Sequence, residues 1–271
     1  MTKRKNRVAP ARAEQAPKQQ SRYYRGDKQE RSNYSNNYST QIDDNVFSLQ
    51  PTSYRRKSIE LVPKSISQET YIDLLTDWEK LIIFATGPAG TGKTMMAVLA
   101  GLKALKEGEV QKIIITRPAV EVDEEKHGFL PGDLTSKMEP WTRPIFDVIQ
   151  EYFSPRDVAR MVDEQIIEIS PLAYLRGRTF KNAWIIFDEA QNSTVNQMKM
   201  VLTRLGDNSK MVITGDLRQQ DRKFVLDNGL KDFIDRLAQS RSGMISTVDF
   251  GLKDIQRHPV VKEILNLYGE D

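Results

Sequence analysis

From about residue 59 onward, two kinds of segment alternate along the chain. Short, continuous apolar runs typical of buried strands lie at residues 81–85, 112–116, 166–170, 184–187, 210–214 and 243–248. Apolar positions at helical spacing lie at residues 94–105, 140–152, 194–205, 229–238 and 259–268. Continuous apolar strands joined through helices are typical of a parallel sheet that is covered on both faces. We therefore predict an α/β domain with a mainly parallel, doubly wound sheet.

The first 58 residues have a different pattern. Residues 1–31 contain ten Lys or Arg but only three Asp or Glu, and Ile, Leu and Val are sparse up to about residue 50. Such a segment buries too little apolar surface to offset its ordering entropy. We predict a disordered basic tail at residues 1–58 and a folded domain at 59–271. Basic residues interleaved with Tyr23, Tyr24, Tyr34 and Tyr38 suit nucleic-acid binding, and a solvated tail that aids solubility explains the same composition equally well.

The composition narrows the class of protein. No apolar stretch approaches the roughly 20 residues that cross a bilayer, so we expect no membrane partner. The chain has no Cys among its 271 residues and a formal net charge of +3. A chain of this length can hold a core without disulfides, and the absence of Cys fits a reducing compartment. We therefore expect a cytoplasmic protein.

A glycine-rich motif connects the first predicted strand to the first predicted helix. It consists of Gly87, Pro88, Ala89, Gly90, Thr91, Gly92, Lys93 and Thr94. Glycines let successive backbone N–H groups face inward, and the helix adds its positive end, so the segment can bind phosphates. In such a P-loop the lysine contacts the β- and γ-phosphates and the Thr hydroxyl is a ligand of Mg²⁺. A purely structural glycine turn is the alternative, and the strand directly before the motif argues against it.

Two carboxylates follow the apolar run at residues 184–187. Asp188 is placed to hold Mg²⁺, and Glu189 to polarise the attacking water as general base. A strand that ends in a charged loop is the common alternative for such a pair, and the upstream P-loop favours the functional interpretation. A third strand ends in Thr214, Gly215 and Asp216, which could respond to the γ-phosphate or form a solvated turn.

Several blocks of sequence together resemble the PhoH family of P-loop ATPases, which is related to superfamily-one helicases. Besides the P-loop they are TRPAVE at 116–121, GFLPGDL at 128–134, PLAYLRGRTF at 171–180, FDEAQN at 187–192, QMKMVLTRLG at 197–206, TGD at 214–216 and RHPVV at 257–261. The resemblance covers about residues 60–270 and excludes the basic tail. It implies a RecA-like P-loop NTPase fold.

The resemblance also implies a homo-oligomeric ring, with a hexamer favoured, and ATP at the subunit interfaces. In such rings an arginine from the neighbouring subunit completes the site. Arg257 matches the helicase-like arginine motif, and its permanent charge suits a phosphoryl transition state. Arg178 is a second candidate for this role. Either residue could instead be a surface arginine or a phosphate anchor.

Three further residues gain roles from the resemblance. Gln219 resembles the helicase glutamine that senses the γ-phosphate, although residues 220–223 depart from the family pattern directly after it. Gln68 resembles a glutamine that contacts adenine through its amide, and an ordinary surface glutamine is the alternative. Arg117 resembles an arginine that contacts the nucleic-acid backbone, and an arginine paired with an acid is the alternative.

Together these features predict a Mg²⁺-dependent ATPase that acts on RNA or single-stranded DNA, with Lys93, Glu189 and Arg257 as catalytic residues. A kinase or other phosphotransferase with the same P-loop fold is one alternative. A regulatory ATP-binding module with weak hydrolysis is another.

Overall fold

The computed structural model describes residues 58–118, 134–218, 228–240 and 242–256, together with positions 259, 260, 263 and 267. For residues 134–141 it describes the backbone alone. The predicted tail up to residue 57 lies outside the described residues, and so do Gln219 and Arg257.

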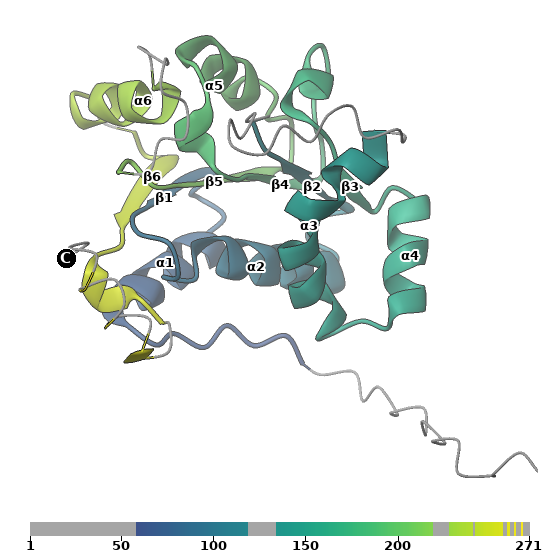
Figure 1. Cartoon of the computed structure of the whole chain (residues 1–271). Coiled ribbons are helices and arrows are strands. Elements are labelled where there is room, and N and C mark those ends of the chain that lie inside the picture. Colours follow the sequence, from purple (N-terminus) through teal and green to yellow (C-terminus); the bar gives the residue numbers. More distant parts are fainter. Residues whose placement is uncertain are drawn as a thin grey trace, which may run out of the picture. The chain divides into compact units, whose positions relative to one another are not determined.

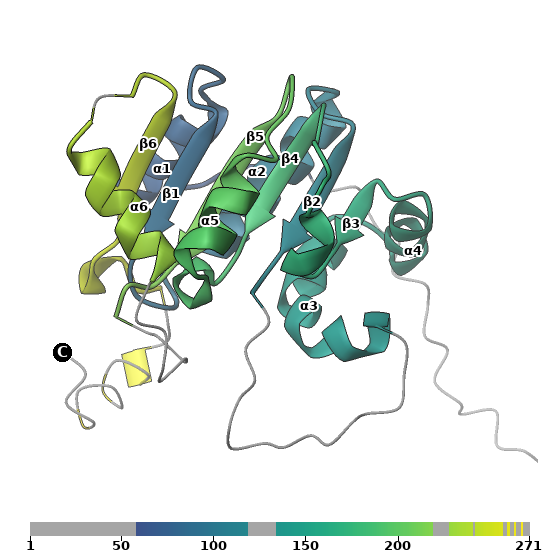
Figure 2. The same cartoon turned by 90° about the horizontal axis from the view of Figure 1, so that it is seen from above.

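The described strands form a single six-stranded sheet whose pairings are all parallel. They are β1 (Ile82–Thr86), β2 (Lys112–Thr116), β3 (Ile167–Ile169), β4 (Ala183–Phe187), β5 (Lys210–Gly215) and β6 (Ile245–Asp249). Figure 2 shows them side by side in the order β3-β2-β4-β5-β1-β6. Each strand overlaps one of the predicted apolar runs. Because all pairings are parallel, the prediction of a parallel sheet is confirmed.

Helices cover both faces of this sheet, which makes it doubly wound as predicted. They are α1 (Ile66–Thr76), α2 (Lys93–Glu107), α3 (Leu134–Gln150), α4 (Pro155–Asp163), α5 (Val195–Leu202) and α6 (Gly229–Ala238). Helices α1 and α2 lie on one face, and α5 and α6 lie on the other (Figure 1). Within the described part of the chain, no helix combines the length and the apolar character needed to cross a membrane.

Alternate residues of the strands supply two separate cores. Ile83 and Ala85 of β1 pack in the cluster that includes α1 and α2, whereas Phe84 packs in the cluster that includes α5 and α6. The same alternation holds in β2, where Ile113 and Ile114 belong to opposite clusters. Burial on both faces explains why the inner strands β1, β2, β4 and β5 are mostly apolar, whereas the edge strands β3 and β6 are only partly buried and contain polar residues.

The helix predictions are correct for α2, α5 and α6 and incomplete elsewhere. Helices α1 and α4 were not predicted because each buries few apolar side chains; α4 buries only Val158 and Met161. Helix α3 begins at Leu134, before the predicted start at residue 140. The prediction began the helix at Pro140, but the helix contains both Pro140 and Pro144. The four described positions within 259–268 are helical, and the rest of that predicted helix lies outside the described residues.

A buried lysine links α1 to the sheet. Lys210, at the start of β5, donates hydrogen bonds to the carbonyl oxygens of Leu74 at 3.0 Å, Leu75 at 2.6 Å and Asp77 at 2.8 Å. It thereby satisfies carbonyls at the carboxyl end of α1, where a cation is also favoured by the helix dipole. Burial lowers the pKa of Lys210 to about 8, against the opposing effect of Asp77 and Glu109. Lys210 therefore fixes the helix that carries Gln68.

Candidate functional site

The loop between β1 and α2 has the backbone expected of a phosphate-binding loop. Gly87, Gly90 and Gly92 have φ angles of 130°, 82° and 86°, which L side chains rarely adopt. A Cβ on Gly87 would also lie 2.3 Å from the carbonyl oxygen of Phe250. Gly92, the N-cap residue of α2, has no side chain that could cap the first turn, which leaves N–H groups of that turn for an anion.

Lys93 spans this loop from the first turn of α2. Its Nζ donates to the carbonyl oxygens of Gly87 and Pro88, both at 2.7 Å, and to the hydroxyl of Thr91 at 3.3 Å. Burial lowers the pKa of Lys93, while the nearby carboxylates of Asp216, Glu189 and Asp188 oppose that shift. The ammonium is therefore held at the loop by neutral oxygen acceptors, which a charged phosphate can replace.

The end of β4 meets the P-loop helix through Asp188. The Thr94 hydroxyl donates a 2.8 Å hydrogen bond to Asp188 Oδ1, and the hydroxyl of Thr214 donates to the same oxygen. Thr214 belongs to β5, the strand that lies between β1 and β4. Two strand ends and the first turn of α2 thus place a carboxylate and two hydroxyls together, a set of oxygen atoms that suits Mg²⁺.

Glu189 is fixed in an unusual backbone conformation beside this cluster. Its φ of 51° and ψ of 40° lie in the left-handed region, and its carbonyl accepts from the N–H of Asn192 at 3.1 Å. Its Oε2 accepts a 2.6 Å hydrogen bond from Nε2 of Gln191, and Arg117 Nη2 lies 3.9 Å from its Oε1. The acid paired with Arg117 is thus Glu189 itself.

These side chains line one hollow of about 260 Å³. Its lining residues are Ala89, Gly90, Gly92, Lys93, Thr94, Met95, Asp188, Glu189, Gly215 and Asp216. The sequence motifs therefore converge at the carboxyl edge of the sheet, where ligands bind in open α/β folds.

Gln191 is a site residue that the sequence analysis did not identify. While its Nε2 donates to Glu189, its Oε1 accepts from the N–H of Asp216 at 3.1 Å. It is almost fully buried and connects the carboxylate of Glu189 to the end of β5. The available signal was its place in the motif, two positions after Glu189.

Gln68 lies behind the P-loop, where both ends of its amide bond to the backbone. Its Nε2 donates to the carbonyl of Thr91 at 2.9 Å, and its Oε1 accepts from the N–H of Lys64 at 2.7 Å. The contact between Gln68 and adenine stays a prediction. In this structure the amide stabilises the P-loop.

A segment near the carboxyl end of the chain also holds the P-loop. The N–H of Gln256 donates to the carbonyl of Gly90 at 2.8 Å. Burial would raise the pKa of Asp254, but hydrogen bonds from Ser65, the N–H of Gly251 and Ser67 hold it below its usual value. Asp254 thereby connects this segment to the start of α1. The segment ends at Gln256, the residue before Arg257 in the sequence.

Arg178, the second candidate for the interface arginine, is engaged within its own chain. Its guanidinium binds both carboxylate oxygens of Glu168, with Nη2 2.7 Å from Oε2, and lies over the ring of Phe180. Arg178 is not among the described residues that line the hollow at the P-loop. The side chain of Arg178 is 38% exposed.

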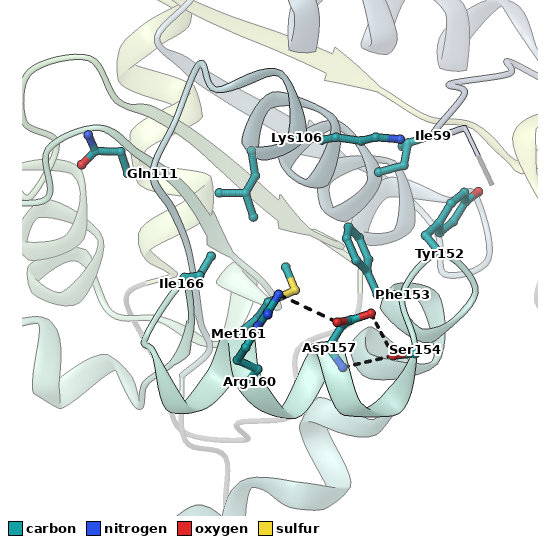
Figure 3. A pocket seen from close by; sticks show the side chains of 11 residues that line it. Ile59, Lys106, Gln111, Tyr152, Phe153, Ser154, Asp157, Arg160, Met161 and Ile166 are labelled. Carbon is teal, nitrogen blue, oxygen red and sulfur yellow. Dashed lines mark hydrogen bonds and ion pairs between the residues drawn. The ribbon is translucent and has the colours of Figure 1, made fainter. Parts of the chain in front are cut away.

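A larger cavity of about 440 Å³ lies at the amino-terminal edge of the sheet, opposite the edge that carries the P-loop. Figure 3 shows the side chains that line it. Gln111 and Ile166, which directly precede β2 and β3, line it together with Phe153 and Met161. The P-loop follows the carboxyl end of β1, so this mainly apolar cavity is separate from the phosphate site.

Comparison with known proteins identifies the family. The family model described as "PhoH-like protein" matches residues 60–269. The chain belongs to the PhoH-like family. The parallel, doubly wound sheet with a P-loop between β1 and α2 agrees with the P-loop NTPase fold that the resemblance implied.

Curated PhoH-like proteins are similar over most of the folded part. A PhoH-like protein of Bacillus subtilis is 44% identical over 216 residues, which are 79% of this chain and 65% of that protein. A PhoH-like protein of Mycobacterium tuberculosis is 42% identical over 83% of this chain and 62% of its own length. Protein PhoH of Escherichia coli is 41% identical over 70% of this chain and 53% of its own. The chain thus spans less than two thirds of the length of these relatives.

One solved structure shows a distant likeness to the chain. The Pif1 helicase from Candida albicans aligns with 76% of this chain and 44% of its own, at 12% identity and a TM-score of 0.36.

Proposed function

We propose that this PhoH-family chain binds ATP with Mg²⁺ and hydrolyses it, in a homo-oligomeric cytoplasmic ring that acts on RNA or single-stranded DNA. One observation carries the proposal: Lys93 and Thr94 of α2 and Asp188 and Glu189 after β4 line a single hollow. A phosphate loop, oxygen ligands for a cation and a carboxylate base are the parts that nucleotide hydrolysis needs.

The oxygen atoms at Thr94 and Asp188 fit Mg²⁺, because both side chains are hard ligands and already contact each other. When bound, Mg²⁺ neutralises charge on the β- and γ-phosphate oxygens.

Different residues of the chain bind the phosphates and activate the attacking water. The N–H groups of the loop and of α2 bind the phosphates, and Lys93 exchanges the carbonyls of Gly87 and Pro88 for phosphate oxygens. Glu189 accepts a proton from water as the water oxygen attacks the γ-phosphorus, and the bond from that phosphorus to the β-γ bridging oxygen breaks. The products are ADP and inorganic phosphate.

Arg257 is proposed to stabilise the transition state from the adjacent subunit. Its action from an adjacent subunit rests on the resemblance, since the described contact of the preceding residue, from the N–H of Gln256 to the carbonyl of Gly90, lies within one chain. Arg178 is the weaker candidate because Glu168 already engages its guanidinium. Gln219 remains the proposed sensor of the γ-phosphate.

The proposal is tested by the rate of phosphate release from ATP with and without single-stranded RNA, single-stranded DNA or duplex DNA. Salt is held constant because nucleic-acid affinity depends steeply on it. We expect Mg²⁺-dependent release that single strands stimulate, and none from Lys93→Ala. Equal rates with every nucleic acid would refute the action on single strands. Transfer of the γ-phosphate to another acceptor, without free phosphate, would indicate a phosphotransferase.

A further inference from the structure

The two carboxylate oxygens of Glu189 are held unequally. Oε2 accepts a short hydrogen bond, 2.6 Å, from the buried amide of Gln191, which is itself bonded to the backbone of Asp216. Oε1 has a looser contact, since Arg117 Nη2 is 3.9 Å away. The side chains of Arg117 and Glu189 are 33% and 35% exposed. One side of the carboxylate is therefore fixed, and the other is held by a group at the surface.

The backbone on both sides of this contact is fixed. Thr116 ends β2, pairs with Phe187 of β4 and accepts a 2.9 Å hydrogen bond from the N–H of Asp188. Arg117 and Glu189 each follow this region of paired strand ends, so they face each other across neighbouring strands. The guanidinium can change partner by rotation of its own side chain, without a shift of the sheet.

The contact opposes the proposed role of Glu189. A general base needs a free lone pair on the oxygen that accepts the water proton. The guanidinium lies on the side of the carboxylate that Gln191 leaves open, with Nη2 3.9 Å from Oε1. A nucleic-acid phosphate can accept two parallel N–H bonds from Arg117, whereas Glu189 offers it only Oε1 at 3.9 Å, because Oε2 is bonded to Gln191.

We propose that Arg117 restrains Glu189 in the absence of nucleic acid and releases it when a backbone phosphate of a single strand binds the guanidinium. This inference rests on the proposed function and adds to it the residue through which nucleic acid stimulates hydrolysis. Arg117 is accordingly a positioning residue that acts through Glu189.

The test compares Arg117→Gln with the unchanged protein in phosphate release, with and without a single-stranded oligonucleotide. Because the contact is an exposed ion pair, its removal should raise the basal rate by roughly two- to fivefold and reduce the stimulation ratio accordingly. The slope of log affinity against log salt for the oligonucleotide should become shallower by about 0.7, as expected when one phosphate is no longer neutralised. Arg117→Lys keeps the charge and should retain part of both effects.

Arg160→Gln is the matched control. Arg160 also pairs with an acid at the surface, with Nη2 3.8 Å from Asp157 Oδ1, but it lies on α4 at the opposite edge of the sheet. This variant should keep the basal rate, the stimulation ratio and the salt slope.

The outcomes separate this inference from the proposed function. If the oligonucleotide stimulates the unchanged protein and Arg117→Gln by the same factor, the restraint is wrong and the proposed function stands. A folded Arg117→Gln with a lower basal rate would also overturn it, because the arginine would then assist catalysis directly. If the unchanged protein is not stimulated at all, both the action on nucleic acid and the release step fail.

Discussion

Thr94 and Asp188 lie 94 positions apart in the sequence, yet the Thr94 hydroxyl donates a 2.8 Å hydrogen bond to Asp188 Oδ1. The contact joins the first turn of α2 to the end of β4. It brings the two predicted magnesium ligands together and places Lys93 and Glu189 on the same hollow.

The first prediction concerns Lys93. We expect Lys93→Ala to abolish ATP turnover, because the phosphates lose the cation of the loop, while the fold survives. Phosphate release measures turnover, isothermal titration measures ATP binding, and circular dichroism checks the fold. Lys103→Ala is the control, since Lys103 lies on the same helix and pairs with Glu107 at the surface. Wild-type turnover in a folded Lys93→Ala protein would show that the P-loop assignment is wrong.

The second prediction concerns Lys210 and pH. The folded-state pKa of about 8 lies below the ordinary value of 10.5, so the unfolded chain binds more protons between these pH values. The contribution of Lys210 to the free energy of unfolding therefore rises with pH across this window, by up to about 2 kcal/mol between about pH 7.5 and about pH 9.5.

Urea unfolding of the unchanged protein and of Lys210→Met at both pH values measures this contribution. The variant lacks the titrating group and leaves the carbonyls of Leu74, Leu75 and Asp77 without their donor. Its deficit in stability relative to the unchanged protein should be larger at the higher pH. A deficit that is the same at both pH values would mean that Lys210 titrates normally.

The third prediction concerns Arg257. Arg257→Ala should lower turnover far more than ATP affinity, because charge develops on the phosphate mainly in the transition state. Mixing it with Glu189→Gln subunits should restore some activity, since an intact arginine can then face an intact base. Absence of recovery at every ratio, with subunit exchange verified, would place the arginine in its own site or outside catalysis.

The fourth prediction concerns the amino-terminal segment. Deletion of residues 1–50 should leave basal ATPase activity and ring assembly intact, because the family match begins at residue 60. Nucleic-acid affinity should fall, with a salt slope shallower by about 0.7 for each phosphate that the segment neutralises on a single strand. Unchanged affinity would favour the solubility role, and loss of ATPase activity would move the domain boundary toward the amino terminus.

The parts of the site that sequence could predict are those set by local chemistry. The P-loop needs glycines with positive φ next to a lysine, and Asp188 and Glu189 follow an unbroken apolar strand, so their places are visible in the sequence. Gln191 and Lys210 were missed because their roles depend on tertiary contacts, with the backbone of Asp216 and with the end of α1.

Helices α1 and α4 were missed for a related reason. Their stability comes from caps and a few buried side chains, which give little periodicity. Ser154 and Pro155 are a helix-start signal that was available at α4, where the Ser154 hydroxyl accepts from the N–H of Asp157. Pro140 was interpreted as a helix start, although the helix already runs through it.

The hydrolytic role of Glu189 is tested most directly by single-turnover ATP hydrolysis in Glu189→Gln, with ATP affinity measured on the same sample. Glu107→Gln, an exposed carboxylate on α2 that pairs with Lys103, is the control and should behave as the unchanged protein. We predict that Glu189→Gln binds ATP with unchanged affinity and hydrolyses it at least about 100-fold more slowly, because the shape of the site is kept and the base is lost. Hydrolysis at the rate of the unchanged protein would contradict the assignment of Glu189 as the base.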